Sequence, residues 1–177
     1  LSIAAKIESG HFVTTPGSTD CLWLADRMAE RLRGLSDHLG VSLHITHAHP
    51  VRPLAIDGEL AERIFSRLLS AVIIGCDHGE ELGGRFRTEP GAQPVDRFIL
   101  SLPRRLRALD EAELFGTSAV HDNADVAPLL GLGFSLRLVR NLARNAGGDL
   151  RFYNEALILS LPAVIDGQSL YQGEERD

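Results

Sequence analysis

The chain has 177 residues, 44% of them hydrophobic, which is enough to bury one core but not two full domains. Its formal net charge of -6 argues against nonspecific nucleic-acid binding, which needs a broad cationic face to displace counterions from phosphates. The apolar runs fall well short of the roughly 18 to 20 residues that a membrane span needs. We therefore expect no membrane contact by this segment. Its two cysteines, Cys21 and Cys76, form no disulfide framework, which suits a reducing compartment and predicts a cytoplasmic location, either alone or within a larger, membrane-attached protein.

The first part of the chain predicts a helix and then a strand. Apolar residues recur at helical spacing over 24–39, with Asp20 available as a cap and Gly40 as a left-handed stop. Apolar and polar residues then alternate over 41–46, which is the pattern of a half-buried strand. Cys21 and Cys76 form no paired motif and are expected to be buried thiols.

The middle of the chain predicts a second helix and a hairpin. Asp57 can cap a helix whose apolar face runs over 60–72, and glycines at 79, 83 and 84 are expected to end it. Residues 84–103 predict two strands around a turn at 89–91.

The last part of the chain predicts a long loop, a helix and a closing hairpin. Residues 104–130 have weak periodicity, with a short helix over 109–115, and a loop of this length is often functional. A helix is expected after the glycines at 131 and 133, ending at 147–148, with Arg137, Arg140 and Arg144 on its solvated side. Strands at 150–153 and 157–161 follow, joined by a tight turn at 154–155.

This order predicts an α+β fold, a two-layer sandwich whose helices cover one face of a mixed, mainly antiparallel sheet. We assign residues 13–165 to this domain. Residues 166–177 are a polar tail, and residues 1–12 resemble the end of a helix that begins upstream.

Four segments in this order resemble the catalytic ATP-binding domain of sensor histidine kinases, a Bergerat-fold ATPase. "IAAKIESGHF" is similar to the end of the second dimerisation helix and its linker, and "LAIDGELAERIFSRLLSAVI" to the helix that carries the family's Asn box. "LLGLGFSLRLVRNLARNAGGDLRF" is similar to the last glycine box and its helix, and "ALILSLPA" to the final strand. The resemblance implies the family's sandwich fold and ATP as a ligand.

The residues that hold Mg-ATP in this family are replaced here. Gapless matching from Asp57 places the two Asn positions at Arg67 and Ala71, neither of which offers an oxygen to Mg²⁺. Matching back from residues 114–115 places the D-x-G-x-G adenine box at Ser101, Pro103 and Arg105. The chain therefore resembles a degenerate member of the family, in which Mg²⁺ is not expected and ATP binding is weakened.

The last glycine box matches the family's pattern better than the Asn box and the adenine box do. Gly131 and Gly133 match its first two glycines, Ser135 stands at the third, and Leu136 follows. Amides at a helix N-terminus favour phosphate, so this junction is the best remaining anion site, although glycine before a helix is also ordinary loop chemistry. No strand precedes the glycines, which argues against a dinucleotide-binding motif. The candidate cofactor-binding residues are Gly131, Gly133, Ser135, Leu136, Ser101, Arg67 and Arg105; none is proposed as catalytic or as a metal ligand.

Two further clusters have alternative interpretations. His44, His47 and His49 have a spacing that could ligate a metal, but surface histidines are the preferred interpretation. The basic run 103–107 could bind phosphate or an acidic partner, or it could pair with acidic residues within 110–113.

Three functional hypotheses follow. The first is a pseudokinase domain of a two-component pathway, impaired in Mg-ATP binding, that docks to a response regulator or another two-component protein. The second is a divergent but active histidine kinase domain that binds ATP through its remaining glycine loop and arginines. The third is a phosphotransfer or dimerisation scaffold, in which an upstream helix carries the functional histidine and this domain only positions a response regulator. A homodimer through upstream helices is a separate expectation.

Overall fold

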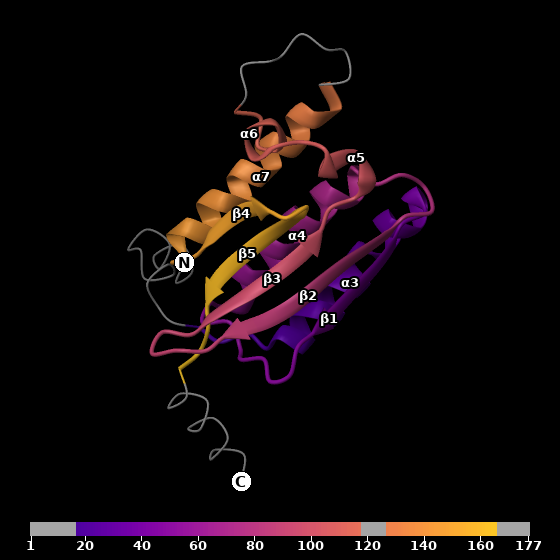
Figure 1. Ribbon diagram of the computed structural model, residues 1–177. Coiled ribbons are helices and arrows are strands. Elements are labelled where there is room, and N and C mark those ends of the chain that lie inside the picture. Colours follow the sequence, from indigo (N-terminus) through magenta and orange to yellow (C-terminus); the bar gives the residue numbers. More distant parts are fainter. Residues whose placement is uncertain (1–16, 118–126, 166–177) are drawn as a thin grey trace, which may run out of the picture.

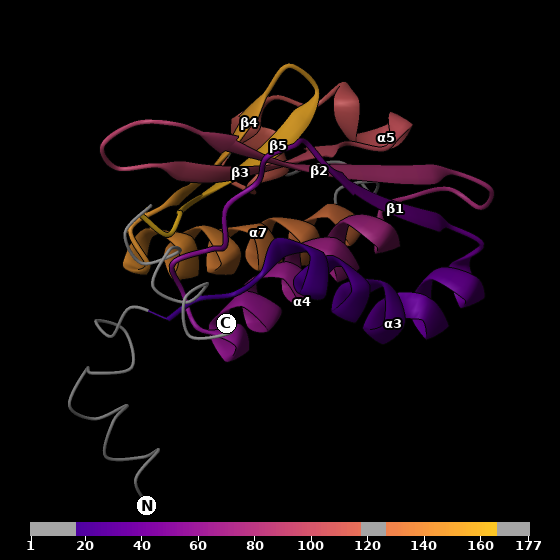
Figure 2. The ribbon, with the colours of Figure 1, turned by 90° about the horizontal axis from the view of Figure 1, so that it is seen from below.

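The computed structural model describes residues 17–117 and 127–165, and the segments predicted as a helix remnant (1–12) and a polar tail (166–177) lie outside these ranges. The described residues form one five-stranded sheet with long helices on one of its faces (Figure 1). Figure 2 shows the two layers edge-on, with α3, α4 and α7 below the sheet. The predicted two-layer α+β sandwich is confirmed.

The sheet is mixed and mainly antiparallel, as predicted. Its strands are β1 (Ser42–His47), β2 (Glu81–Glu89), β3 (Val95–Ser101), β4 (Asp149–Tyr153) and β5 (Ala156–Pro162). They lie in the order β1-β2-β3-β5-β4, and β1 with β2 is the parallel pair. Asn154 and Glu155 both have positive φ, 52° and 63°, which closes the β4–β5 hairpin with the predicted tight turn.

The two predicted N-terminal helices form with the expected caps. In α3 (Cys21–Leu39) the Asp20 carboxylate accepts from the backbone N–H groups of residues 22 and 23, and Gly40 ends the helix at φ 67°. In α4 (Gly58–Ile74) the Asp57 carboxylate accepts from the N–H of Leu60 at 3.0 Å. Satisfying these free amides fixes where each helix begins.

The core lies between α4 and the middle of the sheet. Phe65 of α4 packs on Phe86 of β2 and Phe98 of β3, with ring centroids 5.5 and 5.2 Å away. Gly84 makes room for this cluster, because a Cβ at that position would lie 2.3 Å from the ring of Phe98. Both cysteines are buried, as expected, and burial raises the pKa of the Cys76 thiol to about 11.

Three predicted boundaries were wrong. Helix α4 ends at Ile74, and the glycines at 83 and 84 lie inside β2, where the second one accommodates Phe98. The predicted loop 104–130 begins with a short helix that was not expected, α5 (Arg104–Arg107), whereas α6 (Glu111–Leu114) lies within the range 109–115 that was predicted to be a short helix. Helix α7 (Ala127–Asn145) begins before its glycines, whereas the sequence placed them ahead of the helix.

None of the helices in the described ranges is both long enough and apolar enough to cross a membrane.

Candidate functional site

A polar hollow lies between α3, α4 and α7, on the helix layer. Its volume is about 720 Å³. Arg67 and Ser135, two of the residues predicted from the sequence, both line it, although they come from different helices. The rest of the lining is Arg31, Leu32, Glu59, Glu62, Arg63, Ser66 and Ser70. The hollow therefore combines guanidinium, hydroxyl and carboxylate groups.

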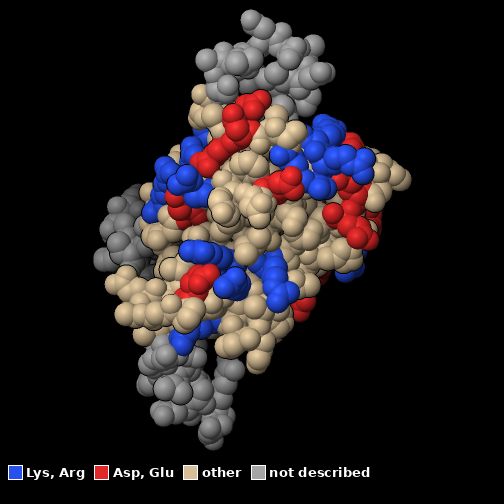
Figure 3. All heavy atoms as spheres, in the orientation of Figure 1, with Lys and Arg blue, Asp and Glu red and all other residues tan. Residues whose placement is uncertain are grey.

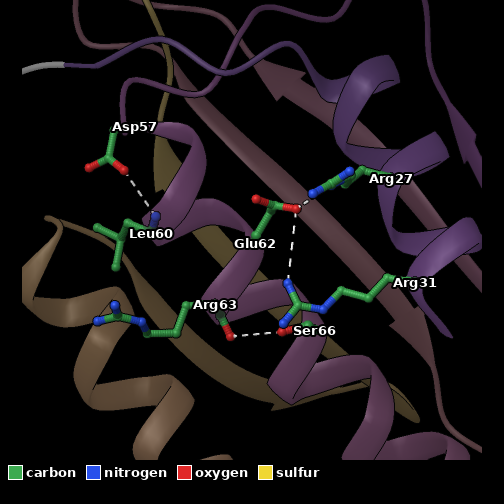
Figure 4. A network of polar contacts seen from close by, with 7 residues as sticks. All are labelled: Arg27, Arg31, Asp57, Leu60, Glu62, Arg63 and Ser66. Carbon is green, nitrogen blue, oxygen red and sulfur yellow. Dashed lines mark hydrogen bonds and ion pairs between the residues drawn. The ribbon is translucent and has the colours of Figure 1, made fainter.

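One wall of the hollow is an ion-pair network between α3 and α4 (Figure 4). Glu62 Oε1 lies 2.6 Å from Arg27 Nε and 3.9 Å from Arg31 Nη1. In Figure 4 the Glu62 carboxylate lies between these two side chains, while Arg63 extends away from it. The charge of Glu62 is thus engaged by α3.

Two further arginines of α4 that line the hollow have no such partner in the described part of the chain. Among residues 17–117 and 127–165, no carboxylate lies within ion-pair distance of the guanidinium of Arg63 or Arg67. Ser66 and Ser70 donate their hydroxyls to the carbonyls of Arg63 and Arg67, at 3.4 and 3.2 Å, and so stay close to the helix. The hollow therefore presents two unneutralised cations to an incoming anion.

The other predicted residues do not share this hollow. Ser101 is exposed at the end of β3, whereas its neighbours Leu100 and Leu102 are buried. Alternate residues of a strand point to opposite faces, so Ser101 faces away from the helix layer. Arg105 lies in α5, where its Nη1 is 3.4 Å from Oδ1 of Asp77. Asp77, and not the predicted acidic residues within 110–113, is the ion-pair partner of the basic run.

The two glycines of the last box lie inside α7 and have different surroundings. A Cβ at Gly133 would lie 3.0 Å from the backbone of Phe115 and of Gly116, so this glycine allows α6 and α7 to approach closely. A Cβ at Gly131 would meet nothing within 4 Å. Leu136 is fully buried in the core. Because the helix begins at Ala127, the free amides of its N-terminus precede Gly131, and the predicted glycine-loop junction is not formed.

Two arginines predicted to be on the wet side of α7 are instead part of this α6–α7 junction. Arg137 donates from Nη1 to the carbonyl of Phe115 at the end of α6. The guanidinium of Arg140 lies over the ring of the buried Phe115, 4.4 Å from its centroid. Arg144 is exposed, as predicted, and pairs with Asp149 at 2.9 Å.

A buried carboxylate lies at the far end of β3. Asp96 is 1% exposed; its Oδ1 accepts from the hydroxyl of Thr88, while Oδ2 has no partner among the described residues. Burial raises the pKa of Asp96 to about 7, against the opposing effects of Thr88 and the nearby Arg52. This group is a candidate for pH-dependent stability.

The histidine cluster does not converge. His44 and His47 are three residues apart in β1, so their side chains leave opposite faces of the strand. Within residues 17–117 and 127–165, no three or more His, Cys, Asp or Glu side chains are grouped so that they could hold a metal ion.

Sequence reasoning missed Arg31, Arg63, Ser66 and Ser70 of the hollow. A local signal did exist for α4, since Arg63, Arg67 and Ser70 recur at helical spacing on its polar side. No local signal pointed to Arg31, because its position depends on how α3 packs against α4.

Comparison with known proteins supports the fold. No family model and no curated protein sequence matches this chain. Among solved structures, the catalytic domain of histidine kinase ThkA matches with TM-score 0.53 and 9% identity, over 84% of this chain and 95% of that one. The mycobacterial sensor histidine kinase MprB matches with TM-score 0.54 and 15% identity, over 84% and 98%. Acinetobacter baumannii histidine kinase AdeS matches with TM-score 0.52 and 11% identity, over 93% and 79%.

The chain therefore has the fold of the catalytic domains of sensor histidine kinases, as its sequence motifs predict. At identities this low, the similarity establishes the fold alone. The chemistry of the site follows from this chain's own residues.

Proposed function

We propose that this domain is a histidine-kinase-like module of a two-component pathway that is impaired in Mg-ATP binding and acts by docking to a response regulator or another two-component protein. The observation that carries the proposal lies in α4, where Arg67, which lines the hollow, and Ala71, which is buried, stand at the positions that match the family's magnesium ligands.

The residues of the hollow do not fit a magnesium ion. Mg²⁺ is bound by oxygen ligands, whereas Arg67 has donors alone and Ala71 is a buried methyl group. Glu62 is held by two arginines of α3. Glu59 lies eight residues before Arg67, about 12 Å along the helix, and is too far away to take over the missing position. No phosphoryl-transfer step is therefore assigned to this site.

The adenine position is also occupied differently. The side chain matching the adenine carboxylate, Ser101, faces the opposite side of the sheet. On the inner side, Leu102 and Leu106 are buried, and a Cβ at Gly75 would lie 3.0 Å from Cδ1 of Leu106. These leucines occupy the space at the end of β3 as part of the core, which supports a loss of purine binding.

The unpaired arginines favour a second candidate, a phosphate-bearing ligand such as ATP bound without metal. Arg63, Arg67 and Ser135 line one hollow, and guanidinium groups bind phosphate oxygens through paired N–H donors. In this alternative the domain is a divergent kinase whose arginines replace the metal. Its binding would be weakened by salt, because the hollow is open to solvent.

An equilibrium titration with a non-hydrolysable ATP analogue, with and without Mg²⁺, separates the two candidates. The pseudokinase proposal predicts no Mg²⁺-dependent binding, and micromolar affinity that requires Mg²⁺ would overturn it. Binding without metal that disappears in Arg67→Ala would establish the second candidate. Arg105→Ala is the matched control, since Arg105 pairs with Asp77 outside the hollow.

Docking is tested with purified receiver domains of response regulators, by biolayer interferometry against the immobilised chain. We expect saturable binding of at least one receiver that does not change when the ATP analogue is added. If none of the receivers binds, the docking part of the proposal fails. A cytoplasmic location and a homodimer through upstream helices are further predictions of the same proposal.

A further inference from the structure

The outer face of the sheet lies opposite the long helices α3, α4 and α7 (Figure 2). The short helix α6 reaches this face at its β4 edge, where Glu111 pairs with Arg151. Figure 3 shows this face, with basic side chains gathered over the middle of the sheet. The outward-facing residues at its centre, here named the basic sheet face, are Arg85, Arg87, Arg97, Ile99, Arg151 and Ile158.

The charges of the basic sheet face are only partly neutralised within the chain. Arg151 has a partner of its own, since its Nε lies 3.2 Å from Oε1 of Glu111 in α6. Arg87 and Arg97 are directly opposite each other on β2 and β3, and the carboxylate of Glu89 lies 3.5 Å from each. Arg85 has no carboxylate within ion-pair distance among the described residues. Like charges directly opposite in a sheet are destabilising, so folding alone does not account for this arrangement.

The centre of the basic sheet face is apolar. Ile99 and Ile158 are opposite each other on β3 and β5, and both are half-buried. Arg85 pairs with Ile99 and Arg151 with Ile158, so one row across the sheet reads arginine, isoleucine, isoleucine, arginine. Tyr153, 71% exposed, lies on the same side of β4. Arginine and aromatic side chains around an apolar centre are typical of protein–protein interfaces.

We infer that the basic sheet face is a docking surface for a partner protein with an acidic surface. This inference rests on the proposed docking function and adds the location and the chemistry of the partner. The whole chain has a net charge of -6, so an acidic partner is repelled by most of the surface and steered to this face. The small number of arginines and the apolar centre favour a protein over a nucleic acid, which needs many phosphate contacts.

The test is an NMR titration of the ¹⁵N-labelled 177-residue chain with a soluble poly-glutamate peptide and, separately, with the receiver domains. For the peptide we expect chemical-shift changes over β2, β3, β5 and β4. The affinity should fall about five- to tenfold in Arg85→Glu and stay unchanged in Arg33→Glu. Both arginines are exposed and lack an ion pair in the described part of the chain, and both variants change the net charge equally.

Several outcomes would overturn the inference. One is that the chemical-shift changes are confined to the helix layer, and another is that Arg85→Glu and Arg33→Glu lose the same affinity for the peptide. The inference also fails if a short DNA duplex binds this face more tightly than the peptide does, or if a second copy of the chain occupies the face at raised concentration. If receivers bind but shift other residues, the surface is wrong and the proposed function stands. If receivers do not bind while the peptide maps to the sheet, the proposed function fails and the surface stands.

Discussion

The α6–α7 junction and the outer face of the sheet both carry arginines, and they use them in opposite ways. At the junction, Arg137 bonds to a carbonyl of α6 and Arg140 covers the ring of Phe115. On the sheet, Arg87 and Arg97 share one carboxylate. The comparison shows that a motif resembling a nucleotide-binding box can serve packing here. Incompletely neutralised charge lies on a surface that the motif does not include, where Arg85 has no ion pair among the described residues.

The junction should depend most strongly on Gly133. In Gly133→Val we expect a loss of about 3 kcal/mol in the free energy of unfolding, because the side chain collides with the backbone of Phe115 and Gly116. Urea denaturation measures it. Gly131→Ala is the control in the same helix; with nothing near its Cβ, it should be neutral or stabilising by up to about 1 kcal/mol. Equal losses in both variants would show that the close approach is not formed.

The next largest effect on the free energy of unfolding is expected at Asp96, which lies next to Arg97 in β3 but faces the inner side of the sheet. Replacing Asp96 by Asn keeps an acceptor for the hydroxyl of Thr88 and removes a buried charge. We expect Asp96→Asn to be about 2 kcal/mol more stable than the parent chain at about pH 8. The gain is smaller than the full electrostatic effect because the amide must also be desolvated.

The pH dependence of this effect has a definite sign. Burial raises the pKa of Asp96 to about 7, so the folded chain holds a proton that the unfolded chain releases at lower pH. This contribution to stability is complete below about pH 4 and is lost as the pH rises to about 7. At each pH, the free energy of unfolding of Asp96→Asn is subtracted from that of the parent chain, and this difference isolates the contribution of Asp96. A difference that does not vary between these limits would mean that Asp96 is not the titrating group.

Smaller changes in the free energy of unfolding are expected for the arginines of α7, where one variant removes an internal contact and the other removes a surface ion pair. Arg137→Ala leaves the carbonyl of Phe115 without its donor and should lower the free energy of unfolding by about 1 to 2 kcal/mol. Arg144→Ala removes an exposed pair with Asp149 and should lower it by less than about 0.5 kcal/mol. Thermal denaturation of the two variants in parallel checks this. If Arg144→Ala were the more damaging change, the internal role of Arg137 would be wrong.

The smallest effect is expected on the sheet. Arg97→Thr relieves the repulsion with Arg87 and should raise the free energy of unfolding by a few tenths of a kcal/mol, about the size of a cross-strand pair effect. The same series of thermal denaturation experiments tests whether Arg97→Thr raises the free energy of unfolding, whereas the arginine variants of α7 lower it. A clear loss of stability would show that the contact with Glu89 outweighs the repulsion, and that the arginines of the sheet serve folding after all.

Local signals predicted much of the fold, because they act over a few residues. Asp20 and Asp57 cap the helices they were expected to cap, Gly40 ends α3, and residues 154–155 form the expected turn. The face that Ser101 presents was not predictable in this way, because it depends on how β3 pairs with its neighbours in the sheet. Matching by sequence position placed Ser101 in the adenine box, but β3 turns its side chain to the face of the sheet opposite the helix layer.

The candidate site was predicted in part. Arg67 and Ser135 were named from the resemblance and line the hollow. The glycines were named from the same resemblance, but the backbone contact of Gly133 with Gly116 is a tertiary relation between distant residues. Arg31 could not be found, since the packing of α3 on α4 brings it to the hollow. Motif spacing identified the region, and tertiary packing decided what each residue does there.

The central claim is that the fold of a histidine kinase catalytic domain persists here without Mg-ATP binding. The most direct measurement is the thermal unfolding of the chain with Mg²⁺ alone, with a non-hydrolysable ATP analogue alone, and with both. A ligand at about one hundred times its Kd stabilises a protein by about 2.7 kcal/mol, which raises Tm by several degrees. We predict that the analogue leaves Tm unchanged. A rise in Tm that requires both the analogue and Mg²⁺ would contradict the claim.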